Sequence, residues 1–214
     1  MPDGGGGTSA APASSTLALF PLQSVLFPGG LLGLKVFEAR YLDLVSTCLR
    51  ERRPFGVVAL RRGGDTLAHA GTAVEFEAVG TLAEVLDVDS TQPGILNLRC
   101  RGTQRFRLHQ RRQQADGLWV AQVTAVPDDE DSVPAEGMRA TVRGLSDAME
   151  TLRAQQMHPF LEPYRFDSAG WVANRWCEIL PLSTAARQKL MELPDALIRL
   201  DLVDEFLRSR GVVS

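Results

Sequence analysis

The spacing of apolar residues changes along this chain of 214 residues, and that change constrains its fold more than any other feature. Between residues 72 and 126, apolar and polar residues alternate, as in VEFE and LNLR, which is typical of strands with one buried face. From Met138 onward the apolar residues recur at the spacing of a helical face. Pro127–Gly137, an acidic segment bounded by prolines, separates the two patterns. We therefore predict an α+β protein with a β domain at 17–126, an acidic linker at 127–137 and a helical bundle at 138–214.

The β domain is predicted to contain seven or eight strands and one early helix. Leu17–Leu22 and Leu31–Phe37 have the length of strands, and the Phe27-Pro28-Gly29-Gly30 segment between them predicts a tight loop. Helical spacing predicts a helix over Glu38–Arg53, which Pro54 ends. Turn signals follow about every ten residues, so we expect a closed or nearly closed antiparallel barrel.

The helical bundle is predicted to contain four helices, several of which begin at a recognisable N-cap residue. The first follows an apolar seam that starts at Met138, and the second begins near Ser168. Ser183 or Thr184 is expected to cap the third helix, and Asp195 the fourth. The fourth is apolar on more than one face, which predicts that it is the buried helix of the group.

The first sixteen residues, MPDGGGGTSAAPASST, predict a disordered tail at 1–16, because Gly, Ser, Ala and Pro cannot bury enough surface to order it. This stretch lacks the features of a secretory signal, and no run reaches the roughly 18 apolar residues of a membrane span. Three widely spaced cysteines fit a reducing compartment. We therefore expect a cytoplasmic protein without a membrane partner.

The stretch LALFPLQSVLFPGGLLGLKVFEARY, followed by a short helix and FGVVAL, resembles the amino-terminal substrate-binding domain of the Lon proteases. The resemblance is to small stand-alone members, and it extends from Leu17 to the carboxyl end. It implies a PUA-like β-barrel followed by a helical bundle. It also implies a non-catalytic module that recognises polypeptide, either misfolded chains or a protease or chaperone partner.

The sequence predicts no ATPase, peptidase or cofactor site. A phosphate loop needs Gly-x4-Gly-Lys-Ser/Thr, and neither lysine of the chain follows a glycine. His69, His109 and His158 lack the spacing of metal ligands, so no metal is expected. Cys100 and His109 would meet if a hairpin turned near Gln104, as nucleophile and base. The simpler interpretation is a buried cysteine and an ordinary strand histidine.

Six arginines lie between Arg99 and Val126 against one acidic residue, which gives this predicted hairpin a local net charge of +5. They are Arg99, Arg101, Arg105, Arg107, Arg111 and Arg112. They form either a solvated strand face, across which the acidic linker could lie, or a surface that follows the phosphates of RNA. The overall net charge of −3 argues against a protein devoted to nucleic acid.

Two places are candidates for peptide binding, a loop at the rim of the barrel and the cleft between the barrel and the helical bundle, since pockets form preferentially where domains meet. The loop Phe27, Pro28, Gly29 and Gly30 combines an aromatic side chain with uncovered backbone, so an extended peptide could add there as a strand. The alternative is that Phe27 folds into the core and the glycines only permit the turn. In VFEARY, Phe37 is expected to fill the barrel, with Glu38 in the first helical turn; the alternative is that this motif forms part of a binding surface.

Overall fold

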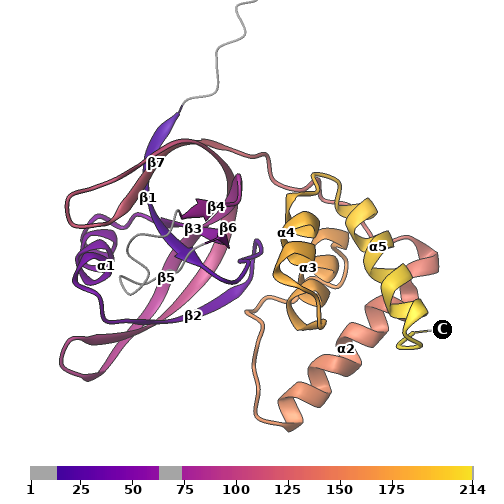
Figure 1. Ribbon diagram of the computed structural model, residues 1–214. Helices are drawn as coiled ribbons and strands as arrows, with labels where there is room; N and C mark the ends of the chain where they lie inside the picture. Colours follow the sequence, from indigo (N-terminus) through magenta and orange to yellow (C-terminus); the bar gives the residue numbers. More distant parts are fainter. Residues whose placement is uncertain (1–13, 63–73, 214) are drawn as a thin grey trace, which may run out of the picture.

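The computed structural model describes residues 14–62 and 74–213, and it divides into a sheet half and a helical half (Figure 1). The sheet half contains one helix packed among seven strands within the described residues. These elements are β1 (Ser15–Leu22), β2 (Leu31–Val36), α1 (Ala39–Glu51), β3 (Phe55–Arg62), β4 (Glu75–Phe76), β5 (Val79–Gln92), β6 (Ile95–Gln113) and β7 (Trp119–Ala125).

The helical half begins with a short 3-10 turn, η2 (Glu136–Met138), and its four helices confirm the predicted number. They are α2 (Arg139–Ala154), α3 (Ala169–Ile179), α4 (Thr184–Glu192) and α5 (Ala196–Ser209). The predicted caps of α3 and α5 are confirmed, since Ser168 accepts from the Trp171 amide and Asp195 from the amides of Leu197 and Ile198. Of the two candidates for α4, Ser183 is the cap.

The strands pair around a ring in the order β1-β7-β6-β5-β3, and β1 closes it by pairing with β3. Most pairs are antiparallel, as predicted, but the closing pair is parallel, with Leu19 opposite Gly56 and Leu22 opposite Ala59. The sheet is therefore mixed rather than wholly antiparallel. That this ring is PUA-like stays a prediction.

The predicted hairpin at Gln104 is wrong, because β6 runs without a break from Ile95 to Gln113. The chain reverses instead on either side of this strand, at Gly94 and Gly117, which have φ values of 76° and 87°. Gly102, in the middle of β6, lets the strand pass against the Phe27 carbonyl, since a β-carbon at this position would lie 2.2 Å from that oxygen. Glycine therefore serves here as a point of close packing rather than as a turn.

One end of a predicted segment differs from the structure. β1 begins at Ser15, two residues before the predicted start of the β domain, and residues 1–13 lie outside the described residues. Residues 63–73, which include His69, lie outside them as well.

Every helix of the described residues is too short or too polar to cross a membrane.

The two halves share an interface, and one hydrophobic cluster includes side chains from both. Phe27 and Val79 of the sheet half pack in that cluster with Leu145, Trp176 and Leu207 of the helical half. The most buried helix is α3 rather than α5, since Leu197, Ile198 and Leu202 of α5 are exposed. Phe37, which was expected to fill the barrel, is 58% exposed instead. Tyr41 is the aromatic residue of this segment that packs inside, and it stacks on Phe20 with ring centroids 4.0 Å apart.

Candidate functional site

Beyond Ala83 one edge of strand β5 has no strand beside it among the residues that the structure describes. The register pairs β3 with β5 only from Phe55–Ala83 to Val57–Thr81, whereas β5 continues its pairing with β6 as far as Gln92. We call the segment Glu84–Asp89 the β5 edge. A strand edge of this kind can accept another extended chain through its backbone N–H and C=O groups.

The β5 edge is shielded against indiscriminate pairing. Glu84, Asp87 and Asp89 are exposed acidic residues, and Asp87 Oδ1 accepts the amide of Val88 at 3.0 Å. The pairing with β6 is also irregular between Val85 and Asp87. Charges and bulges of this kind discourage edge-to-edge aggregation while they leave the backbone accessible to a selected partner.

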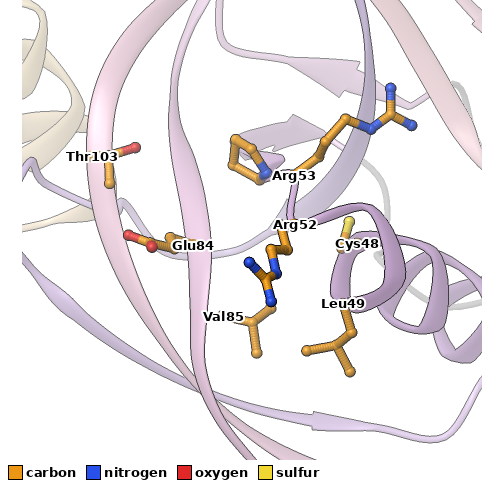
Figure 2. Close-up of a pocket in the computed structure, with 8 residues that line it drawn as sticks. Cys48, Leu49, Arg52, Arg53, Glu84, Val85 and Thr103 are labelled. Atoms are coloured by element: carbon orange, nitrogen blue, oxygen red, sulfur yellow. The ribbon is translucent and has the colours of Figure 1, made fainter.

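A cavity of about 320 Å³ lies between the β5 edge and the carboxyl end of α1 (Figure 2). Its lining residues are Cys48, Leu49, Arg52, Arg53, Pro54, Glu84, Val85 and Thr103. Leu49 is 47% exposed and faces the cavity together with Val85 (Figure 2). The site therefore combines an apolar wall with a strand edge, the two features that a peptide groove needs.

Arg52 supplies the positive charge of this cavity. Its guanidinium lies beside Val85 in Figure 2, and no acidic side chain of the described residues pairs with it. Its neighbour Arg53 is paired with Glu51 at 2.5 Å, and Glu84 is paired with Arg101 at 2.6 Å. Among the charged side chains that line this cavity, Arg52 is therefore the one without an ion-pair partner in the described residues.

The backbone of Arg52 is left-handed, with φ 51° and ψ 45°, at the position that ends α1. Glycine is the usual residue there because other side chains crowd the backbone at positive φ.

A second cavity of about 450 Å³, between α1, β1 and β7, shares Cys48, Arg53 and Pro54 with the first. The end of α1 is therefore bordered by open surface on two sides.

The chemistry of the site is that of recognition. Burial raises the pKa of the Cys48 thiol, so Cys48 is a protonated thiol rather than a nucleophile near neutral pH. In the described part of the chain, no group of three His, Cys, Asp or Glu side chains is arranged to hold a metal ion. The groups present can pack an apolar side chain, pair with a backbone and neutralise an anion.

The loop Phe27, Pro28, Gly29 and Gly30 lies at the interface between the two halves. Phe27 is completely buried, so the alternative in which it folds into the core is the one observed. Arg175 of α3 donates to the carbonyls of Pro28 and Gly29, and Gly30 bridges to Phe160. The carbonyls of Pro28, Gly29 and Gly30 thus accept hydrogen bonds from the chain's own groups, and peptide binding at this loop stays a prediction.

The six arginines do not form one surface. Arg105 is 2% exposed and donates to the carbonyls of Met191, Leu193 and Pro127 and to Asp129. Arg101 is paired with Glu84, and Arg111 donates to the Val74 carbonyl and lies over the Phe76 ring. Arg99, Arg107 and Arg112 are exposed. Of the two interpretations, contact with the acidic linker is observed at Arg105, and the phosphate-binding surface is not favoured.

Cys100 and His109 do not form a catalytic pair. Cys100 is completely buried in the sheet half, and burial raises the pKa of its thiol to about 12. His109 is exposed on the same strand and bonds Thr124 Oγ1 at 2.9 Å. The simpler interpretation of these two residues is therefore the observed one.

Sequence reasoning missed the residues of the β5 edge and its cavity. Leu49 continues the apolar spacing of α1, and Val85 continues the apolar run of β5, so both read as core residues. The one available signal was Arg52, since an arginine ends a helix where glycine is usual. That signal can be used only when the residue at which α1 ends is already known.

The comparisons with known proteins agree with this architecture. Residues 16–209 match the family described as the ATP-dependent protease La (LON) substrate-binding domain. The chain is similar to a crystal structure of a Lon N-terminal domain protein from Xanthomonas campestris, with a TM-score of 0.70 and 34% identity over 88% of this chain and 96% of that one. The N-terminal domain of a Mycobacterium avium complex Lon protease shares the fold, with a TM-score of 0.58 and 14% identity over 89% of this chain and 97% of that one.

Among curated proteins, the chain is 24% identical to a Lon protease of Methylocella silvestris over 209 residues, 96% of this chain and 25% of that protein. The chain thus spans about a quarter of the length of the curated relatives it matches. The predicted resemblance is confirmed, and the match of nearly the whole described chain means that this protein belongs to the LON substrate-binding domain family.

Proposed function

We propose that this protein recognises polypeptides by adding an extended segment to the β5 edge, with an apolar side chain of that segment in the cavity beside α1. The single observation that carries the proposal is the free strand edge next to Leu49 and Val85. The substrate-binding family to which the chain belongs supports the same conclusion.

The physical basis is the pairing of backbone groups that are otherwise left to water. An added strand pairs with the N–H and C=O groups of β5, which supplies affinity independent of sequence. Alternate side chains of the added strand then face the cavity wall, where Leu49 and Val85 favour apolar groups. Unfolded segments, in which apolar residues alternate with polar ones, fit both requirements.

The exposure of Leu86 at this edge adds to the argument. Leu86 is 43% exposed and Leu49 is 47% exposed, so two large apolar side chains remain in water, one on the β5 edge and one at the end of α1. Their burial by an added strand contributes about 25 cal/mol for each Å² covered. An acidic edge also disfavours negatively charged segments along the middle of the strand.

The proposal is tested by replacing Leu49 and measuring the binding of a labelled, reduced and alkylated unfolded protein. We expect Leu49→Glu to weaken binding at least about tenfold, because the variant places a charge against the apolar wall. Leu202→Glu is the matched control, since Leu202 is a leucine of α5 that is 45% exposed. Equal loss of affinity in the two variants contradicts the proposal.

A second measurement locates the contact. A photo-crosslinking residue at position 49 should label the unfolded protein more strongly than the same residue at position 202. Labelling that is confined to position 202 would place the binding surface on the helical half and overturn the assignment to the β5 edge.

A further inference from the structure

The β5 edge is open at one end and closed at the other. β3 occupies the neighbouring position along β5 from Phe55 onward, opposite Ala83. Pro54 and Arg53 precede β3 and line the closed end of the cavity. An added strand can therefore extend along β5 from the distal end, but it cannot continue past Glu84 in the same plane.

A chain that pairs with the β5 edge must end or turn away where β3 begins. If it runs antiparallel to β5, it has the direction of β3, and its last residue reaches the closed end. If it runs parallel to β5, its first residue reaches the closed end instead. The guanidinium of Arg52 lies beside Val85, one residue along the edge from Glu84 at the closed end (Figure 2).

Arg52 distinguishes these two orientations by its charge. An α-ammonium group beside the unpaired guanidinium is repelled, whereas a terminal carboxylate is attracted. Arginine donates two parallel hydrogen bonds to a carboxylate, which makes such pairs both strong and geometrically selective. Glu84, at the closed end, is paired with Arg101, whereas Asp87 and Asp89 farther along the edge disfavour a carboxylate there.

We propose that the β5 edge binds the free carboxyl terminus of an extended, apolar polypeptide, with its terminal carboxylate on Arg52. The inference rests on the proposed function and specifies the substrate class: chains that end in the groove rather than pass through it. The terminal side chain packs against Leu49, the exposed apolar residue that lines the cavity. The left-handed backbone of Arg52 keeps a charged side chain at the position where glycine would be less strained.

The test uses two labelled peptides that differ only in the terminal group. Each is about six residues long, the length of an ordinary strand, with alternating valine and threonine and a terminal leucine. One ends in a free carboxylate and the other in a carboxamide. We expect the carboxamide to bind the wild-type protein at least about tenfold more weakly by fluorescence anisotropy, because charge-assisted hydrogen bonds are lost.

Three variants show whether Arg52 causes the difference. In Arg52→Gln the carboxylate and carboxamide peptides should bind equally, and in Arg52→Lys part of the preference should remain. Arg50→Gln is the matched control, because Arg50 is an exposed arginine of the same helix that does not line the cavity. It should keep the full preference for the carboxylate.

Arg52→Gly separates recognition from folding. Glycine relieves the left-handed strain, so the thermal midpoint should rise or stay constant while the carboxylate preference disappears. Loss of preference in this variant cannot be ascribed to a damaged fold.

The outcomes also separate this inference from the proposed function. If both peptides bind the wild-type protein equally and Leu49→Glu weakens both, the carboxylate assignment is overturned and the proposed function stands. A preference that persists in Arg52→Gln overturns the assignment as well. If neither peptide binds, or if Leu49→Glu leaves the binding of both unchanged, the inference and the proposed function both fail.

Discussion

Arg105 and Asp129 form a buried ion pair between strand β6 and the segment that leads to the helices, with Arg105 Nη2 2.7 Å from Asp129 Oδ1. Arg199 of α5 donates to both oxygens of the same carboxylate, at 2.6 and 3.1 Å. Asp129 therefore joins the sheet half to the last helix. Burial lowers the pKa of Arg105, and Asp129 opposes that shift by favouring its charged form.

Breaking this pair should be costly. Arg105→Ala removes one partner from a site with little solvent access, so we expect a loss of about 3 kcal/mol in the free energy of unfolding. Arg101→Ala is the control on the same strand, because its pair with Glu84 is half exposed and should cost less than about 1 kcal/mol. Urea titrations measure both values, and similar losses would contradict the role given to Arg105.

The segment 127–137 should be resistant to proteolysis although its sequence suggests a flexible linker. Asp129 is paired with two arginines, and the Ser132 carbonyl accepts the Ala169 amide at 2.8 Å. A protease that cleaves after glutamate should therefore cut slowly at Glu130 in the native protein, and faster in Asp129→Asn. Asp128→Asn, at an exposed neighbour, should leave the rate nearly unchanged. Rapid cleavage of the wild-type protein at Glu130 would show that the segment is not held.

Glu178 should make stability depend on pH. Burial raises its pKa from 4.5 to about 7, although Arg175, at 2.7 Å, and Arg187 favour the charged form. The folded protein therefore retains a proton at Glu178 that the unfolded chain has lost between these two values. Stability should fall as pH rises through this range and level off above about 7.

The size of this effect is on the order of 3 kcal/mol at about 1.36 kcal/mol per pH unit. Glu178→Gln has no titrating group, so its stability should change less than that of the wild-type protein between about pH 5 and pH 8. Urea titrations at the two pH values give the comparison. An identical pH dependence in the two proteins would show that Glu178 titrates near its ordinary value.

The three cysteines should differ in their reactivity. Cys100 and Cys177 are completely buried, and burial raises the pKa of each thiol to about 12. Cys48 is 6% exposed and lines two cavities, so alkylation of the native protein should modify it first. Mass spectrometry of partially alkylated protein gives the order. Earlier modification of Cys100 or Cys177 would be inconsistent with the packing described.

Local signals predicted the elements whose structure depends on neighbouring residues. The capping hydroxyl of Ser168 and the carboxylate of Asp195 satisfy amides two or three residues away, so their role is visible in the sequence. The glycine turns at Gly94 and Gly117 are local in the same way. These features need no information about the rest of the fold.

Features set by distant residues could not be predicted. Arg105 alternates with apolar residues as an outward residue would, but the end of α4 and the segment that follows it cover Arg105, so this outward residue is buried. Likewise, the β5 edge exists because β3 begins only at Phe55. Alternation predicts which residues share a face, and it carries no information about what lies on that face or beside that strand.

The pairing of the first strand with the last strand of the sheet half has a consequence for the order of synthesis. Strand β1 ends at Leu22, but β7, which completes its second side, begins at Trp119. At about 5–20 residues per second, a ribosome needs roughly 5–20 seconds to add the intervening chain of about 100 residues. Throughout that interval the first strand made has an open side, and the ring can be completed only after its last strand has left the exit tunnel.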